Sequence, residues 1–120
     1  MKKVEFINYP KCSTCVKARK WLENNNINFE NRDIITKNPN VEEIKNYLKL
    51  SGKEVKKFFN TSGILYREMN LKEKLNNMTE REMIELLATN GKLVKRPLLV
   101  LNDNVLIGFK EEEWGNFLKL

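Results

Sequence analysis

The pattern of the first 35 residues constrains the fold most strongly, because it predicts a strand, a helix and a second strand in succession. Apolar and polar side chains alternate over residues 4–9, and the run stops at Pro10, as in a strand that enters a turn. Apolar residues from Cys15 to Leu22 fall on one helical face, and three asparagines at 24–26 end that helix. Residues 27–35 form the second predicted strand. Two strands joined through a helix are parallel with a right-handed crossover, so the segment predicts a βαβ unit.

The middle of the chain predicts helices. Residues 41–52 carry one apolar stripe that a Ser-Gly pair closes, and residues 71–78 predict a short helix. Residues 79–82 read Thr-x-x-Glu, the sequence of a capping box, ahead of a further apolar stripe. The Asn-Gly pair at 90–91 predicts the C-terminal cap of that helix.

The last part of the chain predicts a hairpin and a helix. Residues 98–101 and 105–109 predict two strands around a tight turn, and three glutamates at 111–113 suit the first turn of a helix. The order β-α-β, helices, β-β-α is that of an α/β protein with a thioredoxin-like fold and a mixed four-stranded sheet. With 120 residues we expect one domain, residues 1–120, with a helical insert at about 38–92.

The amino-acid composition excludes several kinds of catalytic and metal-binding site. The chain has no histidine and two cysteines, which excludes histidine-based catalysis and a four-ligand zinc site within one chain, and we expect no bound metal. The net charge of +6 comes from basic residues spread along the whole sequence, so we expect no direct contact with nucleic acid. The N-terminal apolar stretch is short and broken by Glu5, and no run is long enough to span a membrane. We therefore expect a cytoplasmic protein, in which a cysteine pair is more often catalytic or redox-sensing than structural.

Cys12 and Cys15 lie between the first strand and the first helix. Cys12 is expected at the helix N-terminus, where unpaired N–H groups, the helix dipole and nearby Lys11 favour its thiolate. Cys15 is expected one turn into the helix, close enough to attack a mixed disulfide on Cys12. The same C-x-x-C spacing also suits half of a zinc site, or two cysteines without a role at a helix start.

Arg96 and Pro97 immediately precede the third predicted strand. In a thioredoxin-like fold the proline at this point has a cis peptide bond that faces the cysteine loop. Arg96 is then near Cys12, able to lower its pKa or to hold an anion. Without that fold, Arg96 is an ordinary loop arginine.

Four blocks, YPKCSTCVKARKWLENNNINFENRDI, KKFFNTSGILYREMNLKEKL, VKRPLLV and IGFKEEEW, together resemble the ArsC/Spx family of thioredoxin-like proteins. The resemblance covers essentially the whole chain, which looks most like the small bacterial arsenate-reductase-like branch. In arsenate reductases of this family one cysteine at the position of Cys12 attacks arsenate, and glutathione with glutaredoxin completes the reduction. The resemblance carries over to Cys12 and Arg96.

Two differences from those reductases stand out. The two further arginines that hold the oxyanion there correspond to Asn60 and Gly108, which removes charge-assisted bonds of about 1.5–3 kcal/mol each. Those glutaredoxin-dependent enzymes also lack a second cysteine at position 15. The resemblance therefore implies a thiol-dependent oxidoreductase that reduces arsenate poorly.

Spx-like members of the family do have the C-x-x-C. They are redox-sensing regulators that bind the C-terminal domain of the RNA polymerase α subunit. Gly52 falls close to a glycine that Spx uses at that interface, although a glycine at this point also serves as an ordinary helix cap. A regulator of this kind is the alternative to the enzyme.

The primary expectation is a thiol-disulfide oxidoreductase with Cys12 as nucleophile, Cys15 as resolving thiol and Arg96 as thiolate stabiliser. Its substrate would be a small thiol or disulfide, or an oxyanion, with glutathione, glutaredoxin or thioredoxin as electron donor and no bound cofactor. The expected substrate- or anion-binding residues are Lys11, Ser13, Thr14, Arg96 and Pro97.

Overall fold

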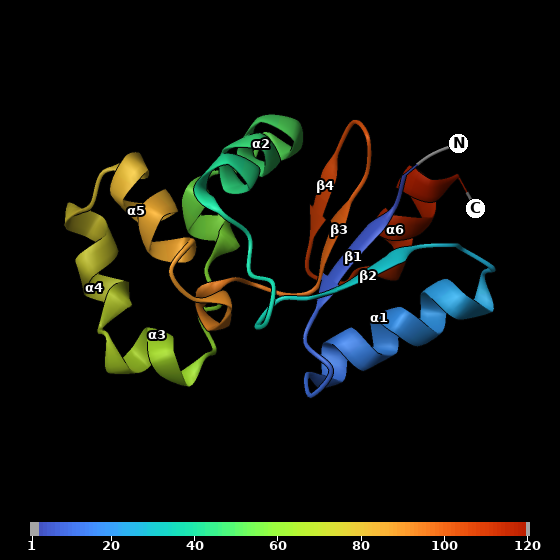
Figure 1. Cartoon of the computed structure of the whole chain (residues 1–120), viewed down its shortest axis with the longest axis horizontal. Coiled ribbons are helices and arrows are strands. Elements are labelled where there is room, and N and C mark those ends of the chain that lie inside the picture. Colours follow the sequence, from blue (N-terminus) through green and yellow to red (C-terminus); the bar gives the residue numbers. More distant parts are fainter. Residues whose placement is uncertain (1–2, 120) are drawn as a thin grey trace.

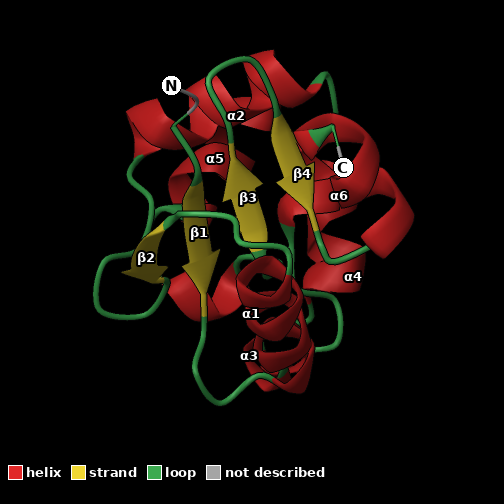
Figure 2. Cartoon of the chain, turned by 90° about the vertical axis from the view of Figure 1, so that its right-hand side faces the viewer, coloured by secondary structure: helices red, strands yellow, loops and turns green. Residues whose placement is uncertain are grey.

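A four-stranded mixed sheet forms the centre of the computed structural model, which describes residues 3–119 (Figures 1 and 2). The strand order is β2-β1-β3-β4; β1 is parallel to β2 and antiparallel to β3, and β3 is antiparallel to β4. The predicted thioredoxin-like α/β arrangement is thereby confirmed. The strands are β1 (Glu5–Asn8), β2 (Glu30–Asp33), β3 (Leu98–Val100) and β4 (Val105–Ile107).

Helices cover both faces of the sheet. Helices α1 (Ser13–Asn24) and α6 (Glu111–Leu118) lie on one face, and the segment between β2 and β3 covers the other (Figure 1). No helix within residues 3–119 is long and apolar enough to cross a bilayer. The intervening segment contains α2 (Val41–Ser51), η1 (Val55–Phe58), α3 (Ile64–Glu68), α4 (Leu71–Lys74), η2 (Leu75–Asn77), α5 (Glu80–Leu87) and η3 (Gly91–Leu93).

The central strands separate two apolar cores, because successive side chains of a strand point to opposite faces. Ile7 and Leu98 pack with the helices of the insert. Their neighbours Phe6 and Leu99 pack with α1, α6 and the fully buried Trp114. The position of the loop that follows β1 therefore depends on both cores at once.

Two helices of the insert begin with a capping box, and the sequence predicts the one at Thr79. Thr79 and Glu82 form a complete capping box at the start of α5. Asn40 and Glu43 form a second one at the start of α2. Gly52 ends α2 in the left-handed conformation, with φ 67°, which glycine adopts without steric cost.

The Asn90–Gly91 pair does not cap α5, so that prediction is wrong. Helix α5 ends at Leu87, and Asn90 instead caps η3, which starts at Gly91. A Cβ atom on Gly91 would lie 1.8 Å from the carbonyl oxygen of Ile34. Gly91 is therefore required by close contact with the segment after β2.

Two further differences are a helix that the sequence did not predict and a strand that is shorter than predicted. Helix α3 was not predicted because none of its residues is buried, and its first residue, Ile64, is 67% exposed. Without a buried stripe there is no periodic signal in the sequence. The second strand covers only 30–33 of the predicted residues 27–35.

Candidate active site

Cys12 is positioned by the short connection between β1 and α1. Its backbone N–H donates a hydrogen bond to the Tyr9 carbonyl at 3.0 Å, and its own carbonyl accepts one from Val16 N–H at 3.0 Å. Cys12 is thus the N-cap residue of α1, and its side chain is partly exposed. A thiol in this position is accessible to a substrate and lies at the positive end of the helix.

The surroundings of Cys12 lower the pKa of its thiol. Burial acts in the opposite direction, but hydrogen bonds from the backbone N–H and thiol of Cys15 outweigh it, together with the hydrogen bond and charge of Arg96. A lowered pKa increases the thiolate fraction near neutral pH, and the thiolate is the nucleophilic form.

Cys15 has the opposite environment. Its side chain is 2% exposed, and its Sγ accepts a hydrogen bond from the Tyr9 N–H at 3.5 Å. Burial raises the pKa of the Cys15 thiol to about 12. The hydrogen bond from the Tyr9 N–H acts in the opposite direction, and the neighbouring Cys12 sulfur adds a smaller rise. The two cysteines therefore combine an accessible, acidic thiol with a buried, protonated one.

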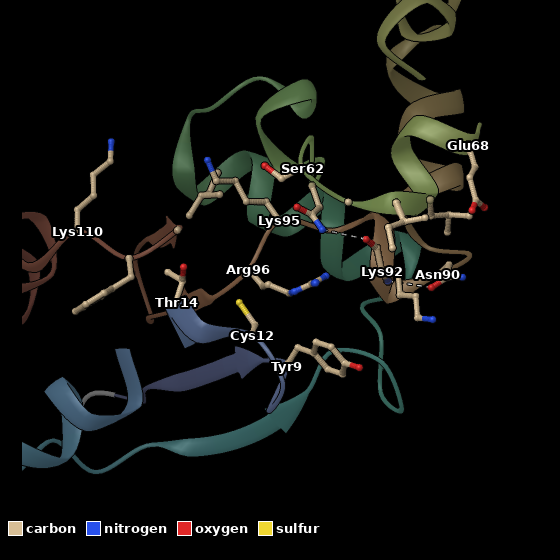
Figure 3. Close-up of a pocket in the computed structure, with 17 residues that line it drawn as sticks. Tyr9, Cys12, Thr14, Ser62, Glu68, Asn90, Lys92, Lys95, Arg96 and Lys110 are labelled. Atoms are coloured by element: carbon tan, nitrogen blue, oxygen red, sulfur yellow. Dashed lines mark hydrogen bonds between the residues drawn. The ribbon is translucent and has the colours of Figure 1, made fainter. Parts of the chain in front are cut away.

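Arg96 faces Cys12 from the segment before β3. The Arg96–Pro97 peptide bond is cis, as the sequence predicts. The guanidinium carbon lies 5.1 Å from the centroid of the Tyr9 ring, and Figure 3 shows the Cys12 sulfur pointing toward Arg96. Within residues 3–119 the buried Arg96 Nη1 has no hydrogen-bond partner. Arg96 itself also lines the cavity next to Cys12, so the residue borders the space that a ligand would occupy.

Cys12, Thr14 and Arg96 open onto one cavity of about 920 Å³ between the sheet, α3 and η3 (Figure 3). Four cationic side chains line it against one carboxylate, Glu68. No three Cys, Asp or Glu side chains of the described chain gather as ligands for a metal ion. The lining is Tyr9, Cys12, Thr14, Asn60, Ser62, Gly63, Ile64, Leu65, Glu68, Asn90, Lys92, Lys95, Arg96, Ile107, Gly108, Phe109 and Lys110.

The other expected site residues lie around this cavity or apart from it. Lys11 and Ser13 are exposed, and Pro97 is buried; the cavity lining does not include them. The leading causes of the lowered Cys12 pKa are Cys15 and Arg96 rather than Lys11. Gly52 lines a separate hollow beside α2.

Several lining residues were not predicted as part of the site. The sequence pattern places Tyr9 only at the end of a strand, and its ring contact with Arg96 links segments far apart in the sequence. Lys92 and Lys95 share the sequence run that contains Arg96, which is the signal that could have identified them. Lys110 had no comparable signal.

Comparison with known proteins identifies relatives of this chain. The model of the ArsC family matches residues 7–117. The protein YusI of Bacillus subtilis (strain 168) is 50% identical over 109 residues, which cover 91% of this chain and 92% of YusI. The regulatory protein MgsR of the same organism is 34% identical over 115 residues, 96% of this chain and 87% of MgsR. Other relatives bear the names arsenate reductase and global transcriptional regulator Spx.

Solved structures share the fold. An ArsC family related protein from Bacteroides fragilis superimposes with a TM-score of 0.93 at 60% identity, over 95% of this chain and 96% of that one. The arrangement of sheet, insert and helices described above is therefore that of a known structural family.

Proposed function

Because the chain belongs to the ArsC family, we propose that it is a thiol-disulfide oxidoreductase in which Cys12 attacks and Cys15 resolves. The observation that carries this proposal is the contrast between the two thiols. Cys12 is accessible with a lowered pKa, whereas Cys15 is buried beside it with a raised pKa. Dithiol exchange requires this division between an attacking and a resolving thiol.

The proposed cycle has two exchange steps. The Cys12 thiolate attacks one sulfur of a substrate disulfide, which forms a mixed disulfide and releases the other substrate sulfur as a thiolate. Cys15 then loses its proton and attacks the Cys12 sulfur, which releases the second substrate thiol and leaves a Cys12–Cys15 disulfide. The neighbouring Cys12 is one cause of the raised Cys15 pKa, so capping Cys12 lowers that pKa and favours the second step.

The Cys12–Cys15 disulfide must be reduced before another cycle. Two electrons from a thiol donor, with glutathione, glutaredoxin or thioredoxin as the candidates, would restore the two thiols. Arg96 would stabilise the Cys12 thiolate each time that it is released.

The first test measures the thiol pKa and the reduction potential. Alkylation of reduced protein at a series of pH values should show Cys12 reacting at lower pH than the ordinary value of about 8.5 allows. Equilibration in glutathione buffers should show a Cys12–Cys15 disulfide whose potential lies near the cytosolic range. A thiol of ordinary reactivity that never forms the disulfide would contradict the proposal.

Two variants separate the roles of the cysteines. Cys12→Ser should abolish turnover of a disulfide substrate, because the attacking thiolate is lost. Cys15→Ser should accumulate the mixed disulfide, which mass spectrometry detects as an adduct on Cys12. Equal turnover by Cys12→Ser and the wild type would refute the assignment.

Arsenate reduction would use the same nucleophile, Cys12, but with fewer cations to hold the oxyanion. Asn60 and Gly108 both line the Cys12 cavity, so the positions matched to the two further family arginines present no cation there. Arg96 would hold the oxyanion with one guanidinium. Arsenate-dependent NADPH consumption, coupled through glutaredoxin or thioredoxin, should therefore be slow compared with disulfide turnover.

A redox-sensing regulator is the second candidate function. The similarity to MgsR favours it, as does the exposure of Gly52, where an added Cβ atom would meet no other atom within 4 Å. Open space at this helix end would let a partner approach the backbone closely. This candidate predicts a redox-dependent complex with the C-terminal domain of the RNA polymerase α subunit.

The matched pair Gly52→Arg and Gly52→Asn tests the regulator. Both residues must adopt the left-handed conformation, and asparagine tolerates it better than most side chains. Arginine should abolish the complex by its bulk, whereas asparagine should weaken it only slightly. No binding by the wild type at tens of micromolar in either redox state would exclude this function.

A further inference from the structure

Two smaller hollows adjoin the Cys12 cavity, because the three share lining lysines. Lys95 lines all three, Lys110 lines the first and third, and Lys57 lines the second and third. The second hollow has a volume of about 450 Å³ and the third about 280 Å³. Together these adjoining hollows extend from Cys12 across the insert to the start of α6.

Positive charge dominates this surface, which we call the lysine trough. Eight cationic side chains line its three hollows, against three carboxylates. The excess of five charges is close to the net charge of +6 of the whole chain. The cations are Lys53, Lys56, Lys57, Lys72, Lys92, Lys95, Arg96 and Lys110, and the carboxylates are Glu54, Glu68 and Glu113.

These cations form no ion pair with a carboxylate of residues 3–119. In the described part of the chain the ion pairs involve Arg32, Lys45 and Arg81, and none involves a cation of the trough. A concentration of unpaired positive charge around a reactive thiol attracts a negatively charged partner.

We propose that the lysine trough docks an acidic protein segment that carries the disulfide on which Cys12 acts; this inference rests on the proposed function. The trough reaches Lys72 and Lys53, outside the Cys12 cavity, and a small thiol or disulfide would leave that part empty. A protein segment both spans such a surface and supplies the sulfur that Cys12 attacks. Nucleic acid supplies the charge but ordinarily carries no disulfide.

The docked step conserves atoms and electrons. The Cys12 thiolate displaces one sulfur of the partner's disulfide, so that one sulfur–sulfur bond forms while another breaks. The displaced sulfur leaves as a thiolate, and the partner segment stays attached to Cys12 until Cys15 releases it. The lysines take no part in the exchange; they hold the segment in place.

Two peptide substrates test the proposal. They share one sequence with a single cysteine, activated as a mixed disulfide with 2-nitro-5-thiobenzoate, and differ only in carrying four aspartates or four asparagines. Release of the coloured thiolate gives the second-order rate constant of Cys12. At low salt the acidic peptide should react about tenfold faster with the wild type. The ratio should fall below about twofold in 0.5 M salt, where charges are screened within about 4 Å.

Two charge-matched triple variants locate the effect. Lys53→Gln, Lys57→Gln and Lys72→Gln remove three trough lysines that do not line the Cys12 cavity. Lys3→Gln, Lys20→Gln and Lys119→Gln remove three exposed lysines elsewhere. The acidic-to-neutral rate ratio should fall to about threefold or less in the first variant and stay near tenfold in the second.

Each contrary outcome has a separate meaning. Equal rates for the two peptides, or equal losses in the two triple variants, would overturn the docking proposal while leaving the thiol chemistry intact. No reaction with either peptide would instead refute the proposed function. If a 20-nucleotide DNA duplex suppresses the acidic peptide's advantage at lower concentration than a cysteine-free acidic peptide does, the trough is a nucleic-acid surface and the proposal is wrong.

Discussion

Arg96 contacts two groups of the site at once. Its guanidinium lies over the Tyr9 ring and also lowers the pKa of the Cys12 thiol. Because Arg96 also lines the cavity beside Cys12, a ligand in that cavity can contact it without displacing it from Cys12. The residue therefore connects the reactivity of the thiol to the occupancy of the cavity.

Replacing Arg96 by glutamine should shift the pH dependence of Cys12 alkylation. The lowered pKa keeps the thiolate present to lower pH, so loss of the guanidinium should raise the midpoint and slow alkylation severalfold at pH 7. Arg96→Lys retains the charge but not the planar guanidinium, so its alkylation midpoint should lie between those of the wild type and Arg96→Gln. Iodoacetamide kinetics from pH 5 to 10 measure this, and an unchanged midpoint in Arg96→Gln would exclude the stabilising role.

The raised pKa of Cys15 predicts a loss of stability at alkaline pH. The unfolded thiol ionises near its ordinary pKa, whereas the folded thiol stays protonated to about 12. The free energy of unfolding should therefore fall between about pH 9 and 12, by at most about 1.4 kcal/mol per pH unit. Urea unfolding of reduced wild type and Cys15→Ala should show this slope in the wild type and a shallower one in the variant.

At the level of elements, η3 packs closely against the segment after β2 because Gly91 has no side chain. Gly91→Ala would place its Cβ 1.8 Å from the Ile34 carbonyl oxygen, so the backbone must move, and we expect a loss of about 1–3 kcal/mol. Gly115→Ala is the control, because its Cβ meets no atom within 4 Å. It should stabilise α6 by about 0.5–1 kcal/mol. The urea midpoints of Gly91→Ala and Gly115→Ala measure these changes. Equal changes in the two variants would contradict the conclusion that close packing requires Gly91.

These elements also show how far sequence patterns determine the structure. The Thr79 capping box, the cap at Gly52 and the strand before Cys12 depend on neighbouring residues, and the sequence predicted each of them. The role of Gly91 depends on Ile34, which is distant in sequence, and local patterns suggest only a helix cap. Helix α3 lacks the buried stripe that periodicity detects.

In the candidate site, too, some features follow from the local sequence and others only from the fold. Cys12, Cys15 and Arg96 were predicted because each lies at the junction of recognisable elements. The contact of Tyr9 with Arg96 follows from the antiparallel pairing of β1 with β3. The lysines gather around the cavity only when the insert folds over the sheet. Charge alone gave no such location, since lysines occur along the whole sequence.

For the whole molecule, the sheet couples the insert to the layer of α1 and α6. Both tryptophans belong to the core on the α1 and α6 side, while Leu87 is fully buried in the core of the insert. Leu87→Ala should cost about 2–5 kcal/mol and move the tryptophan-fluorescence and circular-dichroism midpoints together. A shift in circular dichroism with an unchanged fluorescence midpoint would show that the insert unfolds separately.

The alternation of β1 between two cores has a genetic consequence. Inserting or deleting one codon within Glu5–Asn8 would exchange the faces of the following side chains, because a strand repeats every two residues. The lesion would disrupt both layers and displace the Cys12 loop in one event. Relatives that retain this chemistry should therefore differ in length in the exposed turns of the insert, and in β1 only by substitution.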